Sequence, residues 1–118
     1  MVDDESDIRE VASLSLELTE GWTVTTADGG AAGAELARTM RPDIILLDVM
    51  MPDRDGPNTF AELQRDETTQ PIPVIFLTAK AQAADRDRFL ALGVRGVIAK
   101  PFDPLTLGKQ IKDLLCWT

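Results

Sequence analysis

The stretch Ile44-Ile45-Leu46-Leu47-Asp48 decides the fold, because four consecutive large aliphatic residues end abruptly in a carboxylate. Pro42 and Asp43 precede the run, and a loop that begins at Val49 follows it. An apolar run without alternation is typical of a strand covered on both faces, as in a parallel sheet. Open α/β sheets bind their ligands at the carboxyl ends of such strands, so the sequence predicts that Asp48 lies in a functional crevice.

Three further apolar stretches also end in polar residues of complementary chemistry. These residues are Asp3 and Asp4 after Val2, Thr78 after residues 74–77, and Lys100 after residues 96–99. If the stretches are parallel strands, their carboxyl ends share one edge of the sheet and the polar groups gather there. The sequence therefore predicts carboxylates, a hydroxyl and an ammonium around one point.

Such a group of side chains suits a cation and a phosphoryl group. Carboxylates about 4 Å apart repel one another by roughly 1 to 4 kcal/mol, depending on the effective dielectric, so a cation stabilises them. Oxygen ligands without His favour a hard ion, and Mg²⁺ is the usual one where a phosphate is also bound. Thr78 offers a hydrogen-bond donor and Lys100 a compact positive charge, which suit a phosphoryl group.

The ordered motifs resemble those of the receiver domain of two-component response regulators (the CheY-like family). They are Asp-Asp-Glu at 3–5, Pro-Asp-Ile-Ile-Leu-Leu-Asp-Val-Met-Met-Pro-Asp-Arg-Asp-Gly at 42–56, Pro-Val-Ile-Phe-Leu-Thr-Ala-Lys at 73–80 and Lys-Pro-Phe at 100–102. The resemblance covers nearly the whole chain and implies one receiver domain over residues 1–118. It implies a signalling switch that assists its own aspartyl phosphorylation and dephosphorylation, not an enzyme with a separate substrate.

The resemblance also implies a role for each residue of the group. Asp48 would be the nucleophile that accepts a phosphoryl group from a phosphohistidine, with Thr78 bonded to a phosphoryl oxygen and Lys100 paired with it. The implied ligands of Mg²⁺ are Asp4, Asp48 and the backbone carbonyl of Met50, with Asp3 acting through water. The implied partner is a sensor histidine kinase or a phosphotransfer protein, and a receiver homodimer through the fourth helix, fifth strand and fifth helix fits the resemblance too.

Composition agrees with a small domain of ordinary globular type. A chain of 118 residues predicts one domain that buries about two thirds of its unfolded surface. The formal net charge of −8 argues against nucleic-acid or membrane binding by this chain alone. No apolar run approaches the length of a membrane span, and no secretory pattern is present.

Cys116 is the only cysteine, so we expect no internal disulfide and a cytoplasmic protein. We expect a stand-alone regulator or an excised module, because the sequence shows no effector domain.

Helical patterns separate the predicted strands. The first expected helix runs from Asp7 to about Leu18, with Asp7 and Glu10 as a capping box and with Ile8, Val11, Ala12 and Leu18 on one face. Further helices are expected from Gly30 or Ala31 to Met40, from Gly56-Pro57 onwards, and from about Ala81 to Leu92, where Gly93 ends the helix. Asp103 is expected to cap the last helix, with Pro104 at its first position. Residues 22–26 read as a β-branched edge strand. This alternation predicts a doubly wound, five-stranded parallel sheet with the flavodoxin-like order 2-1-3-4-5.

The first strand is the exception to this pattern. Only Met1 and Val2 precede Asp3, whereas receivers usually carry several apolar residues there. Strand 1 would lie between strands 2 and 3, so its truncation exposes their edges and removes core. Either residues are missing from the chain, or the strand is very short, or another chain completes it, and the sequence leaves all three open.

Two rival functions compete with that of a receiver. A phosphatase of the haloacid dehalogenase type needs an acidic residue two positions after its nucleophile, and Met50 occupies that position. The alternative that remains is a phosphorylation-independent, receiver-like interaction module. The residue that favours this alternative is Val97, because receivers commonly carry an aromatic residue at this position, three before Lys100. By resemblance, Lys100-Pro101 is expected to be a cis peptide, and Met50 and Lys80 to influence the phosphoryl lifetime.

Overall fold

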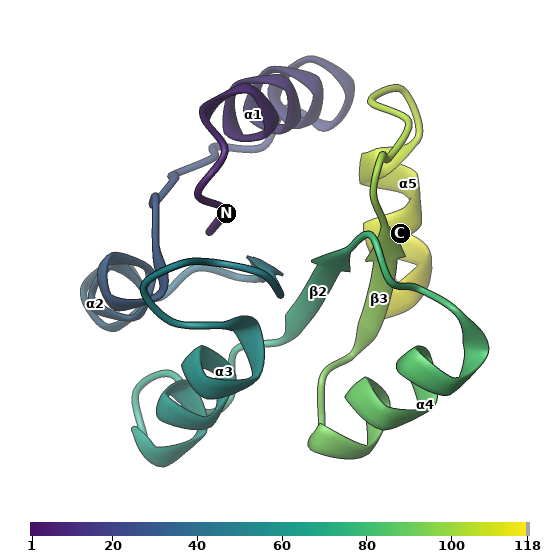
Figure 1. The fold of residues 1–118 in the computed structure, drawn as a ribbon. Coiled ribbons are helices and arrows are strands. Elements are labelled where there is room, and N and C mark those ends of the chain that lie inside the picture. Colours follow the sequence, from purple (N-terminus) through teal and green to yellow (C-terminus); the bar gives the residue numbers. More distant parts are fainter. Residues whose placement is uncertain (118) are drawn as a thin grey trace.

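The computed structural model describes residues 1–117 and contains a parallel sheet with helices on both faces (Figure 1). The helices are α1 (Ser6–Glu20), α2 (Gly30–Met40), α3 (Gly56–Arg65), α4 (Ala83–Leu92) and α5 (Leu107–Leu115), and the strands are β1 (Ile45–Asp48), β2 (Val74–Thr78) and β3 (Gly96–Ala99). Helices α1 and α5 pack on one face of the sheet, and α2, α3 and α4 pack on the other. In the part of the chain described, no helix is long and apolar enough to cross a bilayer.

The sheet pairs β1 with β2 and β2 with β3, all in parallel. Val2 extends this order at the β1 edge, because it forms parallel bridges to Leu47 on one side and to Ala27 on the other. The order in space is therefore the segment around Ala27, then Val2, then β1, β2 and β3. This is the predicted 2-1-3-4-5 arrangement, with a first strand as short as the sequence indicated. The α/β class with a flavodoxin-like fold is confirmed.

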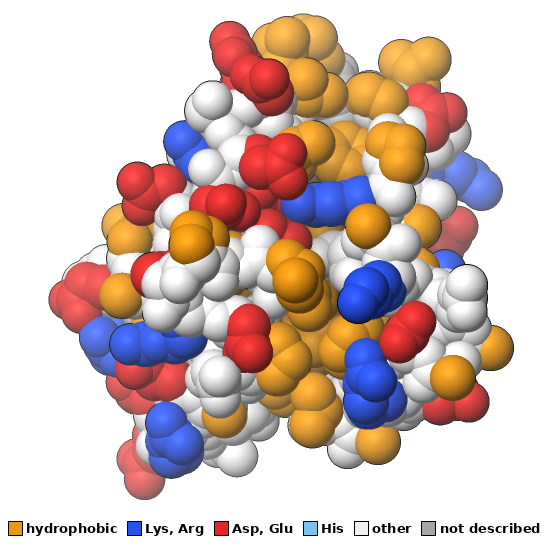
Figure 2. Space-filling model, in the orientation of Figure 1, with side chains coloured by type: hydrophobic (Ala, Val, Ile, Leu, Met, Phe, Trp, Pro, Cys, Tyr) orange, Lys and Arg blue, Asp and Glu red, His pale blue; other side chains and the backbone are white. Residues whose placement is uncertain are grey.

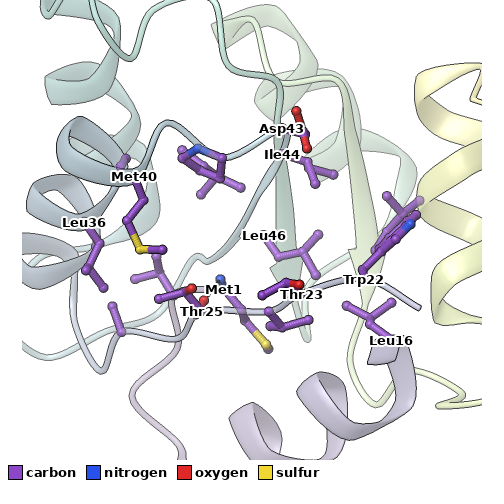
Figure 3. Close-up of a pocket in the computed structure, with 18 of the residues that line it drawn as sticks. Met1, Leu16, Trp22, Thr23, Thr25, Leu36, Met40, Asp43, Ile44 and Leu46 are labelled. Carbon is purple, nitrogen blue, oxygen red and sulfur yellow. Dashed lines mark hydrogen bonds between the residues drawn. The ribbon is translucent and has the colours of Figure 1, made fainter. Parts of the chain in front are cut away.

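The predicted edge strand at residues 22–26 is wrong in the structure, where these residues have no regular secondary structure. A strand needs a neighbour along its length. Only Met1 and Val2 are available as neighbours here, so pairing reaches no further than the bridge at Ala27. A cavity lies beside the rest of this segment (Figure 3).

Helix α1 begins one residue earlier than predicted and uses a different buried face. Glu5 is the N-cap and makes no side-chain hydrogen bond to the helix, so the capping box of Asp7 with Glu10 is wrong. The buried residues are Ala12, Ser15 and Leu16, whereas Leu18 is 76% exposed and Val11 is 43% exposed. At about 100° per residue, the positions of Val11 and Leu18 lie about a quarter turn or more away from the centre of the buried face.

Helix α5 begins at Leu107, later than the predicted start at Asp103-Pro104. Asp103 instead organises the preceding turn, where its carboxylate accepts a hydrogen bond from the backbone N–H of Leu105 at 2.9 Å. Helix α4 begins at Ala83, two residues later than expected, and ends at Gly93 as predicted. Gly93 has φ of 113°, a conformation that favours glycine.

Strand β2 is buried on both faces and separates two apolar layers. On one face, Phe76 packs edge-on against Phe60 of α3 and Phe89 of α4, with ring centroids 6.1 Å and 5.2 Å apart. On the other face, Ile75 and Leu77 contact the buried side of α1 and α5, including Ile111. This two-sided burial explains the uninterrupted apolar runs in the sequence and fixes where each strand ends.

Candidate functional site

The carboxyl ends of the strands bring the predicted polar residues to one edge of the sheet. Asp3 follows Val2, Asp48 ends β1, Thr78 ends β2, and Lys100 follows β3. Over this edge, Figure 2 shows acidic side chains gathered beside a basic one. Asp3, Asp48 and Thr78 are buried, whereas Asp4 is exposed to solvent. The convergence follows from the parallel topology, because every strand points its last residue the same way.

Lys100 occupies the middle of the group. Its Nζ lies 2.7 Å from Asp3 Oδ2 and 3.2 Å from Asp48 Oδ1, and the exposed Glu5 is further away at 3.8 Å. Burial alone would lower the pKa of Lys100, but the hydrogen bond and charge of Asp3, together with Asp48, outweigh it and raise the pKa. The ammonium therefore stays charged. The Lys100-Pro101 peptide is cis, which confirms the expectation.

Asp48 is held in an environment that disfavours its charge. Burial, and then the negative charge of Asp3, raise its pKa to about 6, although Lys100 and the backbone N–H of Met50 act in the opposite direction. That N–H donates to Asp48 Oδ1 at 3.4 Å, which places the backbone of Met50 at the site. Two buried carboxylates share one ammonium, so the group carries more negative than positive charge when both carboxylates are ionised.

An added cation fits this deficit. Asp3, Asp4 and Asp48 each offer a carboxylate oxygen, and these oxygens lie within 4.8 Å of one another. Within residues 1–117, Asp3 Oδ2 is buried and its one polar partner is Lys100 Nζ, with which it forms an ion pair at 2.7 Å. An all-oxygen set with a free buried lone pair suits a hard divalent ion such as Mg²⁺. Asp4 lies on the solvent side, where an ion would enter.

Thr78 is near the group, but its hydroxyl is used elsewhere. Thr78 Oγ1 accepts a hydrogen bond from the backbone N–H of Lys80 at 3.0 Å, and the Thr78 carbonyl accepts one from the backbone N–H of Lys100 at 2.9 Å. Across residues 1–117, its side chain makes no hydrogen bond to Asp48 or to the Lys100 ammonium. The bond from Lys80 shapes the loop after β2, and the hydroxyl hydrogen stays available for a ligand.

Asp53 has a position that the sequence analysis missed. Its carboxylate accepts hydrogen bonds from the backbone N–H groups of Gly30 and Ala31, both at 3.2 Å, and so caps α2. The hydrogen bond from the Ala31 N–H makes the largest contribution to the pKa of Asp53 and lowers it. The one available signal was Gly29 before Gly30, because neither has a side chain that could cap the helix.

The loop after Asp48 depends on Gly56. A Cβ atom there would lie 2.9 Å from the Asp48 carbonyl oxygen, closer than side chains approach a backbone. The backbone N–H of Gly56 donates to the Val49 carbonyl at 2.9 Å, and Asp55 then caps α3 by accepting from the Asn58 N–H at 2.8 Å. The glycine thus lets α3 begin directly against the end of β1.

Comparison with known proteins identifies the family. Residues 1–112 match the family model described as response regulator receiver domain. The chain belongs to the response-regulator receiver family. Receivers of this family act in two-component signal transduction, so the chain is a signalling domain.

Its curated relatives are longer transcriptional regulators. The chain is 36% identical over 115 residues to the DNA-binding dual master transcriptional regulator RpaA of Synechocystis, covering 98% of this chain and 47% of the relative. It is 41% identical over 114 residues to the transcriptional regulatory protein CseB of Streptomyces coelicolor, covering 97% of this chain and 47% of the relative. The chain therefore spans about half the length of the curated relatives it matches.

Solved receiver structures share the fold. The chemotaxis response regulator CheY4 of Vibrio cholerae superposes with a TM-score of 0.88 at 30% identity, covering 96% of this chain and 93% of that one. The N-terminal domain of a response regulator receiver protein from Methanoculleus marisnigri gives a TM-score of 0.78 at 32% identity, covering 99% and 94%. The shortened first strand therefore leaves the receiver fold intact.

We predict that Asp48→Asn stabilises the protein at pH 8 when a chelator removes divalent ions. The raised pKa means that the folded state binds a proton more tightly than the unfolded state between about pH 4 and pH 6. Stability therefore falls as the pH rises through this window, and the loss is complete above it. A shift of roughly two pH units, in which the attraction of Lys100 is already included, corresponds to about 3 kcal/mol, so we expect a gain of up to about 3 kcal/mol.

Urea denaturation at pH 4 and pH 8 measures this effect. The substitution should change stability little at pH 4, where folded Asp48 is already protonated. Asp87→Asn, at an exposed position on α4, is the matched control and should give similar stability changes at both pH values. Equal changes for Asp48→Asn at both pH values would contradict the account of the buried carboxylate.

Proposed function

We propose that this chain is a phosphorylatable receiver over residues 1–118 and that Asp48 accepts the phosphoryl group in a Mg²⁺-dependent reaction. The observation that carries the proposal is the placement of Asp48, a buried carboxylate at the end of β1 whose Oδ1 lies 3.2 Å from Lys100 Nζ. Membership of the receiver family supports the same chemistry.

The reaction assigns a task to each side chain. Asp48 Oδ1 already contacts Lys100 and the Met50 N–H, so we assign Oδ2 as the atom that attacks phosphorus. One P–O bond forms to Asp48, and the bond from phosphorus to the donor nitrogen breaks. Lys100 then transfers its contact from the carboxylate to a phosphoryl oxygen, and the Thr78 hydroxyl donates to another. Such a site acts by positioning the groups and by neutralising charge.

The proposed metal ligands are Asp4, Asp48 and the Met50 carbonyl, with Asp3 acting through water. When bound, Mg²⁺ would supply the positive charge that two buried carboxylates and one ammonium lack. Asp3 needs no direct bond to the ion for this role, because its Oδ1 is already fixed by the backbone N–H of Glu5 at 2.9 Å. The carboxylate is thereby held in place to orient a ligand water.

The proposed phosphoryl donor is a phosphohistidine on a sensor histidine kinase or a phosphotransfer protein, which would place the chain in the cytoplasm. Phosphorylation would alter how the face formed by α4, β3 and α5 binds a partner or a second receiver. The curated relatives are about twice as long and are described as transcriptional regulators. With a net charge of −8, we assign no nucleic-acid binding to the receiver itself.

One residue supports the alternative, a phosphorylation-independent interaction module. Val97 stands three positions before Lys100 and is 4% exposed, so no aromatic ring can move there between a buried and an exposed position. That feature concerns how a signal leaves the site. It leaves the buried Asp48 and its contact with Lys100 unexplained, and we therefore favour the phosphorylatable receiver.

Incubation with acetyl phosphate and Mg²⁺ should add one phosphoryl mass to the protein, detected by intact mass spectrometry. Asp48→Asn should abolish the addition, because an amide is a far weaker nucleophile than a carboxylate. Excess chelator should abolish it in the parent protein. Asp87→Asn is the matched control and should be phosphorylated like the parent. Normal phosphorylation of Asp48→Asn, or of the parent in chelator, would refute the assignment.

The residue at position 50 should control how long the phosphoryl group lasts. Met50 is apolar and has no group that can orient an attacking water, and its backbone lies at Asp48. Met50→Asn should therefore speed dephosphorylation, whereas Met50→Leu should keep the parent rate. Loss of the added mass over time measures both. An unchanged or slower rate for Met50→Asn would show that this side chain does not govern access of water.

A further inference from the structure

The start of α2 lies between the two segments that hold the proposed metal ligands. One segment is the loop 49–55, which follows β1 and carries Met50. The other is the segment around Asp3, whose N–H donates to the Ala27 carbonyl at 3.1 Å. Helix α2 begins shortly after Ala27, at Gly30, and Figure 1 shows the loop between β1 and α3 passing beside this end of the helix. Contacts at the start of α2 therefore reach both segments.

Asp53 joins the loop to the helix. Its two carboxylate oxygens accept hydrogen bonds from the N–H groups of Gly30 and Ala31, each at 3.2 Å. The N-cap of α2 is Gly29, which has no side chain with which to cap the helix. The first N–H groups of an α-helix have no partner within the helix and need an acceptor from elsewhere. Helix α2 receives this acceptor from the loop that follows the proposed phosphorylation site.

Two glycines allow the loop to approach the helix this closely. A Cβ atom at Gly29 would lie 2.9 Å from both carboxylate oxygens of Asp53. A Cβ atom at Gly30 would overlap Thr59 Oγ1 and lie 3.1 Å from the Cβ of Arg54. The backbone of Gly29 is extended, with φ of −169°, which any residue can adopt. The close approach of Asp53, and not the backbone conformation, therefore requires glycine at position 29.

The contact of Asp53 with α2 completes a closed series of contacts around the site. On one side, Lys100 Nζ joins Asp3 to Asp48, at 2.7 Å and 3.2 Å. On the other side, Asp53 joins the loop 49–55 to the start of α2. The members of the series, in order, are Asp3, Ala27, Gly30, Asp53, Met50, Asp48 and Lys100, which returns to Asp3. The two ligand-bearing segments are thus held together from both sides.

Met51 also anchors the loop, but in a different way. Its side chain is buried in the apolar layer between the sheet and α2, α3 and α4, whereas Met50 and Asp53 on either side of it are exposed. Apolar burial is non-directional, so it fixes where the loop lies without fixing how the neighbouring peptide groups are turned. The two hydrogen bonds of Asp53 are directional. They supply the orientation that the packing of Met51 does not.

We propose that Asp53 is a positioning residue for Mg²⁺, which holds the loop 49–55 against α2 so that the Met50 carbonyl faces the carboxylates of Asp3 and Asp48. The inference rests on the proposed metal site. Asp53 does not bind the ion itself, because both of its oxygens face the N–H groups of α2. A site whose ligands are oriented before the ion arrives binds it more tightly, because less ordering of the chain accompanies binding.

Isothermal titration calorimetry with magnesium chloride, in the absence of any phosphoryl donor, tests the proposal. Asp53→Ala should raise the Kd for Mg²⁺ about tenfold, as changes to residues that orient metal ligands commonly do. Asp55→Asn is the matched control, because it removes the same charge from the same loop and keeps a side chain that can cap α3. At physiological ionic strength exposed charges are largely screened, so the control should bind Mg²⁺ within about twofold of the parent.

A second substitution separates the capping of α2 from its connection to the loop. Asp53→Ala removes the carboxylate that would meet a side chain at position 29, so Gly29→Ser can be added to it. The serine hydroxyl can cap α2 from the residue that precedes the helix. The double variant should recover part of the melting temperature that Asp53→Ala loses. It should still bind Mg²⁺ as weakly as Asp53→Ala, because the loop remains unconnected.

Three results would overturn the inference and leave the metal site standing. One is an unchanged Kd in Asp53→Ala, which would show that the loop needs no connection to α2. Another is an equal loss in Asp55→Asn, which would assign the effect to charge alone. The third is a Kd that recovers in the double variant, which would show that a stable α2 is sufficient. Failure of the parent protein to bind Mg²⁺ would instead refute the proposed metal site, and this inference with it.

Discussion

The contact of Lys100 with two buried carboxylates is the interaction on which the site depends. Asp3 and Asp48 would repel each other at this separation, and neither reaches enough water to disperse its charge. Lys100 Nζ lies within 3.2 Å of both and holds them together. Removing the lysine from a buried ion pair of this kind typically costs about 3 to 5 kcal/mol, because the carboxylate charge is left uncompensated. The single ammonium balances one carboxylate. Burial, and then the charge of Asp3, raise the pKa of Asp48 to about 6, and the uncompensated charge leaves a place for a cation.

The strands beneath the site hold these charged side chains in place. Val2 is paired on both sides, which fixes Asp3, and the full burial of β1 and β2 fixes Asp48 and Thr78. Gly56 lets α3 pack against the end of β1 without displacing it. The strands thus set the separation of the charged groups, while the loops beyond them set which groups stay accessible.

Sequence alone predicted the features that follow from strand ends and local patterns. The apolar runs placed Asp48, Thr78 and Lys100 at one edge, and Gly93 marked the end of α4. The failures lie where tertiary contacts decide. The buried face of α1 depends on the angle at which it meets the sheet. Asp53 caps a helix 22 and 23 residues away in sequence, which no local pattern reveals. Residues 22–26 have strand-like composition, but a strand forms only where a neighbour is present to pair with it.

The backbone pairing of Val2 supports the neighbouring Asp3. Towards its carboxyl side, the same backbone pairing that holds Val2 continues into the N–H of Asp3, which donates to the Ala27 carbonyl at 3.1 Å. Towards its amino side, the N–H of Val2 donates to the Leu46 carbonyl at 2.8 Å, and the N–H of Ala27 donates to the Met1 carbonyl at 2.9 Å. The position of Asp3, and through Lys100 the charge balance around Asp48, therefore rests on the backbone pairing of Val2 with Leu47 and Ala27.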